Sequence, residues 1–328
     1  MENMVTRRIL LGFVAALMAL TALFFLGPRV PVDTTIRFDP NLIQDDISAY
    51  LAASEAGIAN LREGLGKEIV WAYPESRAKT PLAIVYVHGF SASKGEVRPL
   101  PDKVASALGA NLFYTRLAGH GRDSAAMASA SVNAWVNDMA EALAIGRAIG
   151  EKVIVMGTST GGGLATWAAA QPDLNEDVAG LVLISPNYRV LATGSEILTM
   201  PWGAQIARMV SGSERGGEPK NELHGKYWTI RYPIEATLPM AAITELARET
   251  LVEEIAIPAL FIFANSDPTV SHVATRDIAR RWGGPAETLV IEPAEGESHH
   301  VIAGDAQSPS TTAALAQKIS SWVQALPQ

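Results

Sequence analysis

The stretch V-I-V-M-G-T-S-T-G-G-G-L, residues 153–164, decides how we expect this chain to fold. Its first four residues are apolar and mostly β-branched, which is typical of a buried parallel strand, and residues 164–170 have the pattern of a helix start. Between them lies G-T-S-T-G, the G-x-S-x-G pattern of a tight strand-to-helix turn that lifts Ser159 clear of the sheet. Glycines suit such a turn because the backbone passes too close to its neighbours for Cβ atoms.

This turn places Ser159 at a helix N-terminus, where backbone N–H groups and the helix dipole favour developing negative charge. Glycine and serine also occur together in ordinary turns, so the pattern alone has a purely structural interpretation. The apolar strand before it and the helix after it favour the interpretation of Ser159 as a nucleophile.

The composition limits the class of protein. The chain has 328 residues, enough for a large core in one elaborated domain or in two. Hydrophobic residues make up 48% and charged residues 18%, which indicates a globular protein. The net charge of -8, with no long basic run, argues against nucleic acid as the main partner. The absence of cysteine excludes a disulfide, a thiolate nucleophile and a cysteine zinc site.

The N-terminus carries a long apolar run. Arg7 and Arg8 precede it, and it extends over residues 9–26, close to the ~20 residues of a membrane span and beyond the roughly 7–15 of a signal-peptide core. No clear A-x-A cleavage site follows. We therefore expect residues 1–30 to form an uncleaved membrane anchor, with the arginines in the cytoplasm and the rest of the chain in the periplasm or outside the cell. The alternative is a cleaved signal and a secreted protein.

Short apolar strands alternate with helices from residue 82 onward. This alternation predicts an α/β fold with a mostly parallel sheet and helices on both of its faces. An edge strand at 69–73 and a helix at 42–61, with Asp39 before it as the cap, precede this part. The predicted strands are 82–87, 111–115, 153–156, 181–184, 260–264 and 288–291, and the predicted helices are 96–108, 132–149, 160–170, 272–282 and 310–326.

The alternation is interrupted once, at residues 186–254. This segment is rich in methionine and aromatic residues, namely Met200, Trp202, Met209, Tyr227, Trp228, Tyr232 and Met240. Because it lies between two strands of the sheet, we expect it to form a cap over the functional site. The alternative is that its apolar residues only form a small satellite core.

A nucleophilic serine needs a base, an acid that orients the base, and donors for the oxyanion. Among six histidines, His88 directly follows a predicted strand and His120 lies in a G-H-G turn. His299 and His300 follow the last predicted strand, in a loop at the sheet edge where sites of parallel sheets lie. These two are the candidates for the base.

Asp267 is the candidate for the acid because it follows the strand predicted at 260–264, at the same sheet edge. An ordinary turn or helix-capping aspartate is the alternative interpretation. Glu297 and Asp305 are rivals, but neither directly follows a predicted strand.

Five short motifs together carry a family resemblance. They are H-G-F at 88–90, R-L-A-G-H-G at 116–121 with Ser124, G-T-S-T-G at 157–161, Asp267 in its turn, and S-H-H-V-I at 298–302 before Asp305. From about residue 81 to residue 305 the chain thereby resembles the α/β-hydrolase fold superfamily, in particular its carboxylesterase and monoacylglycerol lipase branch, which is itself similar to the serine aminopeptidase hydrolases.

The resemblance implies a role for each matching residue. Ser159 matches the nucleophile and Asp267 the acid. His300 matches the base because it directly precedes Val301 and Ile302, and His299 remains the alternative.

The resemblance also implies an oxyanion hole and a domain plan. The backbone N–H groups of Phe90 and Thr160 match the oxyanion donors, and His88 holds the loop that carries Phe90. Residues 31–328 form one α/β-hydrolase domain, with the cap inserted at about 186–254.

These features together predict a serine hydrolase that needs no metal or organic cofactor. The expected substrate is a short- to medium-chain carboxylic ester, with monoacylglycerol as a candidate, cleaved through an acyl-enzyme. Its partners are this ester or lipid and the membrane that holds the N-terminal segment, and the oligomeric state stays open. Amide or peptide hydrolysis, acyl transfer and a non-catalytic binding module are the alternatives.

Overall fold

A seven-stranded sheet forms the centre of the computed structural model, which describes residues 2–43 and 46–327. The strand order is β1-β3-β2-β4-β5-β8-β9, and all neighbours are parallel except β1, which pairs antiparallel with β3 at the edge. The predicted α/β fold class is confirmed. The strands are β1 (Glu68–Val70), β2 (Thr80–Val87), β3 (Asn111–Tyr114), β4 (Gly150–Thr158), β5 (Val178–Ile184), β8 (Ala259–Phe263) and β9 (Ala286–Val290).

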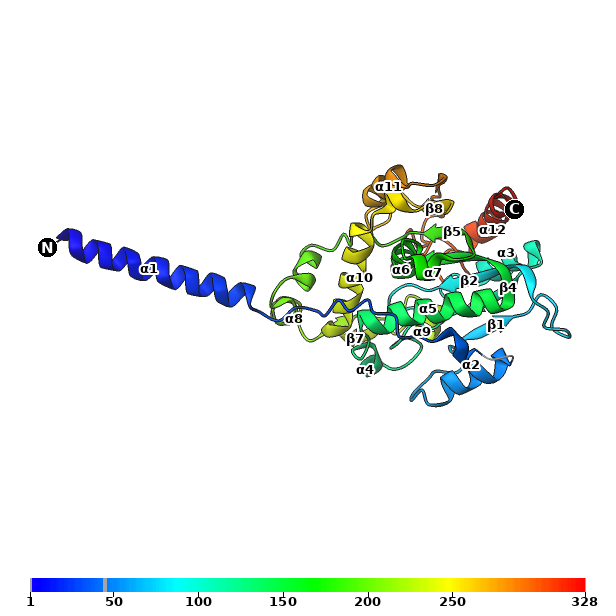
Figure 1. Cartoon of the computed structure of the whole chain (residues 1–328), viewed down its shortest axis with the longest axis horizontal. Helices are drawn as coiled ribbons and strands as arrows, with labels where there is room; N and C mark the ends of the chain where they lie inside the picture. The colour runs from blue at the N-terminus through cyan, green and yellow to red at the C-terminus, as the bar shows by residue number, and fades with distance from the viewer. Residues whose placement is uncertain (1, 44–45, 328) are drawn as a thin grey trace.

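Helices cover both faces of this sheet, as Figure 1 shows. Alternate strand residues face opposite ways, so Val85 and Val155 pack with α5, α6, α10 and α11, whereas Ile84 and Ile154 pack with α3 and α12. The helices of the body are α2 (Ile47–Ala56), α3 (Leu100–Leu108), α4 (Ser124–Met127), α5 (Val132–Ile149), α6 (Thr160–Ala169), α7 (Pro172–Asn175), α10 (Thr237–Glu249), α11 (His272–Arg281) and α12 (Pro309–Gln324).

The helix predicted at 42–61 is shorter than expected. Asp39 caps only a short 3-10 turn, η1 (Pro40–Leu42), and the α-helix begins after Asp46, whose carboxylate accepts hydrogen bonds from the N–H groups of Ser48 and Ala49. The second aspartate therefore provides the N-cap, because it can satisfy two free N–H groups at once. The helix predicted at 96–108 likewise begins later, at Leu100, since the residues before it form turns.

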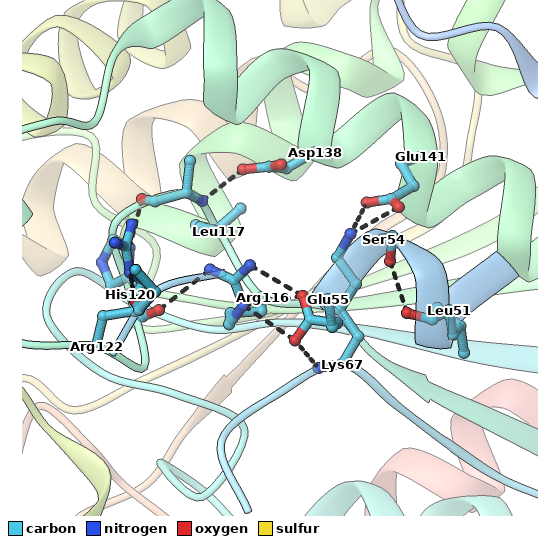
Figure 2. A network of polar contacts seen from close by, with 12 residues as sticks. Leu51, Ser54, Glu55, Lys67, Arg116, Leu117, His120, Arg122, Asp138 and Glu141 are labelled. Carbon is cyan, nitrogen blue, oxygen red and sulfur yellow. Dashed lines mark hydrogen bonds and ion pairs between the residues drawn. The ribbon is translucent and has the colours of Figure 1, made fainter. Parts of the chain in front are cut away.

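Helix α2 and the segment that follows it are each joined to the rest of the domain by an ion pair, and Figure 2 shows both pairs. Lys67 Nζ lies 2.6 Å from a carboxylate oxygen of Glu141 on α5, and both side chains are less than one-tenth exposed. Arg116 lies 2.9 Å from Glu55 at the end of α2. The Tyr50 hydroxyl donates a further hydrogen bond of 2.6 Å to Glu141. Buried charges of this kind depend on each partner being present.

Replacing Lys67 by methionine should lower the free energy of unfolding by about 3 kcal/mol or more, because it leaves the Glu141 carboxylate buried without its counter-charge. The matched control is Lys152→Met, since Lys152 makes an exposed ion pair with Asp177, and its loss should cost about 1 kcal/mol or less. Urea denaturation measures both. Equal losses of unfolding free energy in the two variants would show that burial does not make the Lys67–Glu141 pair more important than an exposed pair.

Helix α1 (Glu2–Phe25) extends away from the body in Figure 1. It includes a 22-residue apolar span, Met4–Phe25, none of which is buried. By length and composition this helix fits either a membrane span or a secretory signal. Its last turn meets the body at Trp202, whose indole N–H donates to the Leu23 carbonyl oxygen at 3.1 Å and whose backbone N–H donates to Pro28 at 2.8 Å.

The 186–254 segment contains both small elements and one core helix. The β6 and β7 strands form an antiparallel pair, while Ile243 and Ala247 of α10 belong to the main core against α6. Part of the segment therefore stabilises the body itself. Its other elements are η2 (Ser195–Thr199), α8 (Gly203–Ser211), β6 (Glu214–Gly216), α9 (Glu222–Tyr227), β7 (Arg231–Pro233), η3 (Ile234–Ala236) and η4 (Val252–Glu254).

Candidate active site

Ser159 is the single residue between the end of β4 and the start of α6, and its backbone has φ +53° and ψ −116°. Such a backbone conformation is unfavourable for a residue with a Cβ atom. Hydrogen bonds to the surrounding chain hold it: the Ser159 N–H donates to Ile184 at 2.9 Å, and its carbonyl oxygen accepts from Asn187 at 2.9 Å. The turn is thus tied to the end of β5.

The glycines of the turn are required by close backbone contacts. A Cβ atom on Gly161 would lie 2.2 Å from the carbonyl oxygen of Val87, and one on Gly157 would lie 2.7 Å from the carbonyl oxygen of Gly161. Any larger residue at either position would have to displace backbone. The close backbone contacts of the turn therefore explain why glycine stands at both ends of the G-x-S-x-G pattern.

The structure brings Ser159, His300 and Asp267 into one hydrogen-bonded chain. His300 Nε2 lies 3.0 Å from Ser159 Oγ, and His300 Nδ1 lies 2.8 Å from Asp267 Oδ2. The other carboxylate oxygen of Asp267 accepts from the N–H groups of Thr269 and Val270 at 2.7 and 3.1 Å. Because Nδ1–H donates to Asp267, Nε2 is left to accept the proton of the serine hydroxyl.

The other candidates for the base and acid lie outside this chain. His299 Nδ1 bonds the hydroxyl of Ser266 at 2.5 Å and lies 3.5 Å from Glu292, so these two residues, and not Ser159, are its partners. Glu297 bonds Ser310 instead of a histidine. Among the residues that the structure describes, the ring of His300 bonds only Ser159 and Asp267.

The backbone N–H groups of Phe90 and Thr160 have no hydrogen-bond acceptor in the described ranges. Both residues line the same cavity as Ser159, and Thr160 is the first residue of α6. An N–H group at a helix start that has no acceptor can stabilise an anion beside it.

Two buried histidines hold the loop that carries Phe90. His88 Nδ1–H donates to the Gly89 carbonyl at 2.9 Å, and its Nε2 accepts from Leu117 N–H at 3.1 Å. His120 Nε2 accepts from Ser91 N–H at 3.0 Å. Burial lowers the pKa of His88 to about 4 and lowers the pKa of His120 well below its ordinary value. Both rings are therefore neutral near pH 7, as their acceptor role requires.

Glu96 is a buried acid at the site that the sequence analysis did not single out. Its Oε2 atom accepts from Gly89 N–H at 2.7 Å and from the Tyr86 hydroxyl at 2.9 Å, and that hydroxyl also bonds Thr158 beside Ser159. Burial raises the pKa of Glu96 to about 7, against a smaller lowering by these hydrogen bonds. Its position soon after H-G-F was the available signal, but loop glutamates are usually solvated.

A cavity of about 630 Å3 opens onto Ser159 and His300. Part of its wall comes from the 186–254 segment, which contributes apolar side chains as well as polar ones such as Arg215, Lys220 and His224; the apolar ones include Ile197, Leu198, Ile206, Val210, Ile234 and Met240. In the ranges that the structure describes, no group of three or more histidine, aspartate or glutamate side chains is arranged to hold a metal ion. The cavity thus contains a serine that is hydrogen-bonded to a histidine, with an apolar surface nearby.

Comparison with known proteins agrees with this fold. The model of the family described as "Alpha/beta hydrolase family" matches residues 84–314. The chain belongs to the alpha/beta hydrolase family. A thermostable monoacylglycerol lipase from Bacillus sp. (strain H-257) is 25% identical over 234 residues, which cover 70% of this chain and 86% of that protein. The family resemblance expected from the motifs is confirmed.

Solved structures show the same fold at low identity. One from a study of two metagenome-derived lipolytic enzymes has a TM-score of 0.66 at 22% identity, covering 80% of this chain and 99% of the other. A soluble variant of monoglyceride lipase from Saccharomyces cerevisiae has a TM-score of 0.60 at 13% identity, covering 79% and 90%. This chain is thus a distant relative of a monoacylglycerol lipase, and the solved structures share its fold.

Replacing Ser159 by glycine should give a more stable protein than replacing it by alanine, by about 1 kcal/mol. Glycine relieves the unfavourable φ of +53°, and this gain exceeds its entropy cost in the unfolded chain. At Ser106 inside α3 the order should reverse, because glycine weakens a helix interior. Urea denaturation of the four variants tests this, and a less stable Ser159→Gly would show that the turn is not strained.

Proposed function

We propose that this protein is a serine esterase that hydrolyses carboxylic esters through an acyl-enzyme on Ser159. The observation that carries the proposal is the position of His300, whose ring is within hydrogen-bond distance of both Ser159 and Asp267. The family's fold and its distant relatives among lipases and esterases support the same class of reaction.

The proposed mechanism assigns one step to each group. His300 takes the proton of the Ser159 hydroxyl as its oxygen attacks the ester carbonyl, while Asp267 keeps the imidazole in the required tautomer. The N–H groups of Phe90 and Thr160 stabilise the oxyanion. His300 then protonates the leaving alcohol, and the acyl group stays on Ser159. A water molecule gives a proton to His300 and attacks the acyl carbonyl, and His300 returns that proton to Ser159 Oγ as the acid leaves.

The proposed substrate is a short- to medium-chain ester, with monoacylglycerol among the candidates. The apolar cavity wall supports an acyl chain, and one relative is itself named a monoacylglycerol lipase. In this proposal residues 31–328 form one hydrolase domain, and the outer part of the 186–254 segment is the cap that covers the acyl chain. Amide hydrolysis, acyl transfer and a non-catalytic binding role are outcomes that the tests below separate.

Ser159→Ala and His300→Ala should each lower kcat for a p-nitrophenyl ester by about 10⁴-fold, because both take part in the same proton transfer. His299→Ala is the matched control, since His299 lines the cavity without bonding Ser159, and it should stay within about tenfold of the unaltered protein. A fluorophosphonate probe, followed by peptide mapping, should label Ser159.

Other outcomes separate the alternatives. Activity retained in Ser159→Ala would disprove the mechanism. A folded protein that neither reacts with the probe nor cleaves an ester would favour a binding role. Faster turnover of a matched anilide, or transfer of the acyl group to added alcohol in preference to water, would identify an amidase or an acyltransferase.

We further propose that α1 anchors the protein in a membrane, with Arg7 and Arg8 in the cytoplasm and the remaining domain outside it. The exposed apolar span of α1 and the contact of Trp202 with its last turn support this arrangement, because tryptophan favours the membrane surface.

The anchored protein should stay in the membrane pellet after alkaline carbonate extraction, and its intact mass should include residues 1–30. Protease added to spheroplasts or cells should digest the domain without lysis. Release of a shorter, soluble chain would instead indicate a cleaved signal, and protection of the domain until lysis would reverse the orientation.

A further inference from the structure

Glu96 has one carboxylate oxygen that the protein leaves without a donor. Its Oε2 atom accepts from Gly89 and Tyr86, whereas in the described parts of the chain no group donates to Oε1. The residue is only 2% exposed, and it lines the cavity above Ser159. Oε1 is not among the fully enclosed polar atoms that lack a partner, so this oxygen is open to the cavity, where a ligand group can donate a hydrogen bond to it.

This oxygen lies close to the reacting serine. A Cβ atom on Gly89 would lie 2.7 Å from Glu96 Oε1 and 3.2 Å from Ser159 Cβ, so the two side chains are neighbours across Gly89. The charge of His300 also acts on the Glu96 carboxyl and lowers its pKa slightly. A group bound at Oε1 therefore belongs to the part of the substrate next to the ester bond.

The cavity wall has two different kinds of surface. Where η2, α8 and α10 form it, the wall is mostly apolar and suits an acyl chain. Where residues 220–227, which include α9, and the 297–307 loop form it, the wall carries polar side chains: Lys220, His224, Glu297, Ser298 and Gln307. Two hydrogen bonds join these two segments, from Lys220 Nζ to Gln307 at 3.1 Å and from Asn221 to Ala306 at 2.7 Å. The polar wall suits the alcohol portion of an ester.

We propose that Glu96 Oε1 binds a free hydroxyl group in the alcohol portion of the substrate, so that partial esters of a polyol are preferred over esters of a simple alkanol. The inference rests on the proposed esterase function. An unsubstituted acyl chain has no donor to offer, so the group must come from the alcohol. A hydroxyl can pair with the carboxyl in either protonation state, whereas an ammonium group needs the ionised form.

The test compares esters that share one acyl group. They are 1-butanoylglycerol, propyl butanoate, which lacks both free hydroxyls, and p-nitrophenyl butanoate, which reports ester cleavage without a polyol. For the unaltered full-length protein, kcat/KM for 1-butanoylglycerol should exceed that for propyl butanoate by about 10- to 100-fold, the size expected for a hydrogen bond to a charged group.

In Glu96→Met this preference should fall to within about threefold, because methionine has a similar length and cannot bind the hydroxyl. Glu96→Gln should keep most of the preference, since its amide can still bond Gly89, Tyr86 and the hydroxyl. The matched control is Glu253→Gln, because Glu253 pairs with Arg281 and lies outside the cavity lining, and this change should leave the preference unaltered.

Each contrary result overturns the inference. If Glu96→Met lowers kcat/KM for all three esters equally, Glu96 only holds the Gly89 loop. If Glu96→Met does not fold, the unaltered protein still decides, since equal kcat/KM for the glycerol and propyl esters excludes the hydroxyl contact. Cleavage of p-nitrophenyl butanoate without any polyol preference would defeat this inference alone, whereas cleavage of none of the esters would defeat the proposed function itself.

Discussion

The close approach of the first turn of α6 to the end of β2 is the constraint on which the rest of the site depends. A Cβ atom on Gly161 would lie 2.2 Å from the Val87 carbonyl oxygen. Because glycine has no Cβ atom, α6 can pack tightly against the sheet. Ser159 is held at positive φ between β4 and α6. The N–H group of Thr160 and the loop after His88 thereby lie around one point. Close backbone packing at such a turn can bring a serine hydroxyl and neighbouring N–H donors to the same side of the turn.

A layer of buried polar groups packs next to this turn and bonds the loops around it. His88, His120 and Glu96 each satisfy backbone N–H groups of the surrounding loops. Burial lowers the pKa values of the two histidines, which are therefore neutral near pH 7, and raises the pKa of Glu96 to about 7. Because these side chains bond backbone N–H groups, they fix the loop that carries Phe90.

Local patterns predicted the body of the fold well. Parallel strands that are buried on both faces have short apolar runs in their sequence. The helix predicted at 132–149 has the same bounds in the structure, because Ser131 caps its start. The helix predicted at 42–61 was wrong in extent, because either of two aspartates could cap it and packing favoured Asp46. The sequence did not identify Glu96, because its position soon after H-G-F does not by itself distinguish a buried loop glutamate from a solvated one.

The sequence by itself determined the alternation of strands and helices, the glycine-bounded turn at Ser159 and the apolar N-terminal run, since each follows from periodicity or backbone sterics within about 20 residues. Tertiary structure alone decided that His300, not its neighbour His299, bonds Ser159, because a one-residue change in a loop turns the side chain toward different partners. It also decided that Glu96 lies beside the serine. Such contacts join residues far apart in the chain, so their geometry depends on how the loops pack on the finished sheet.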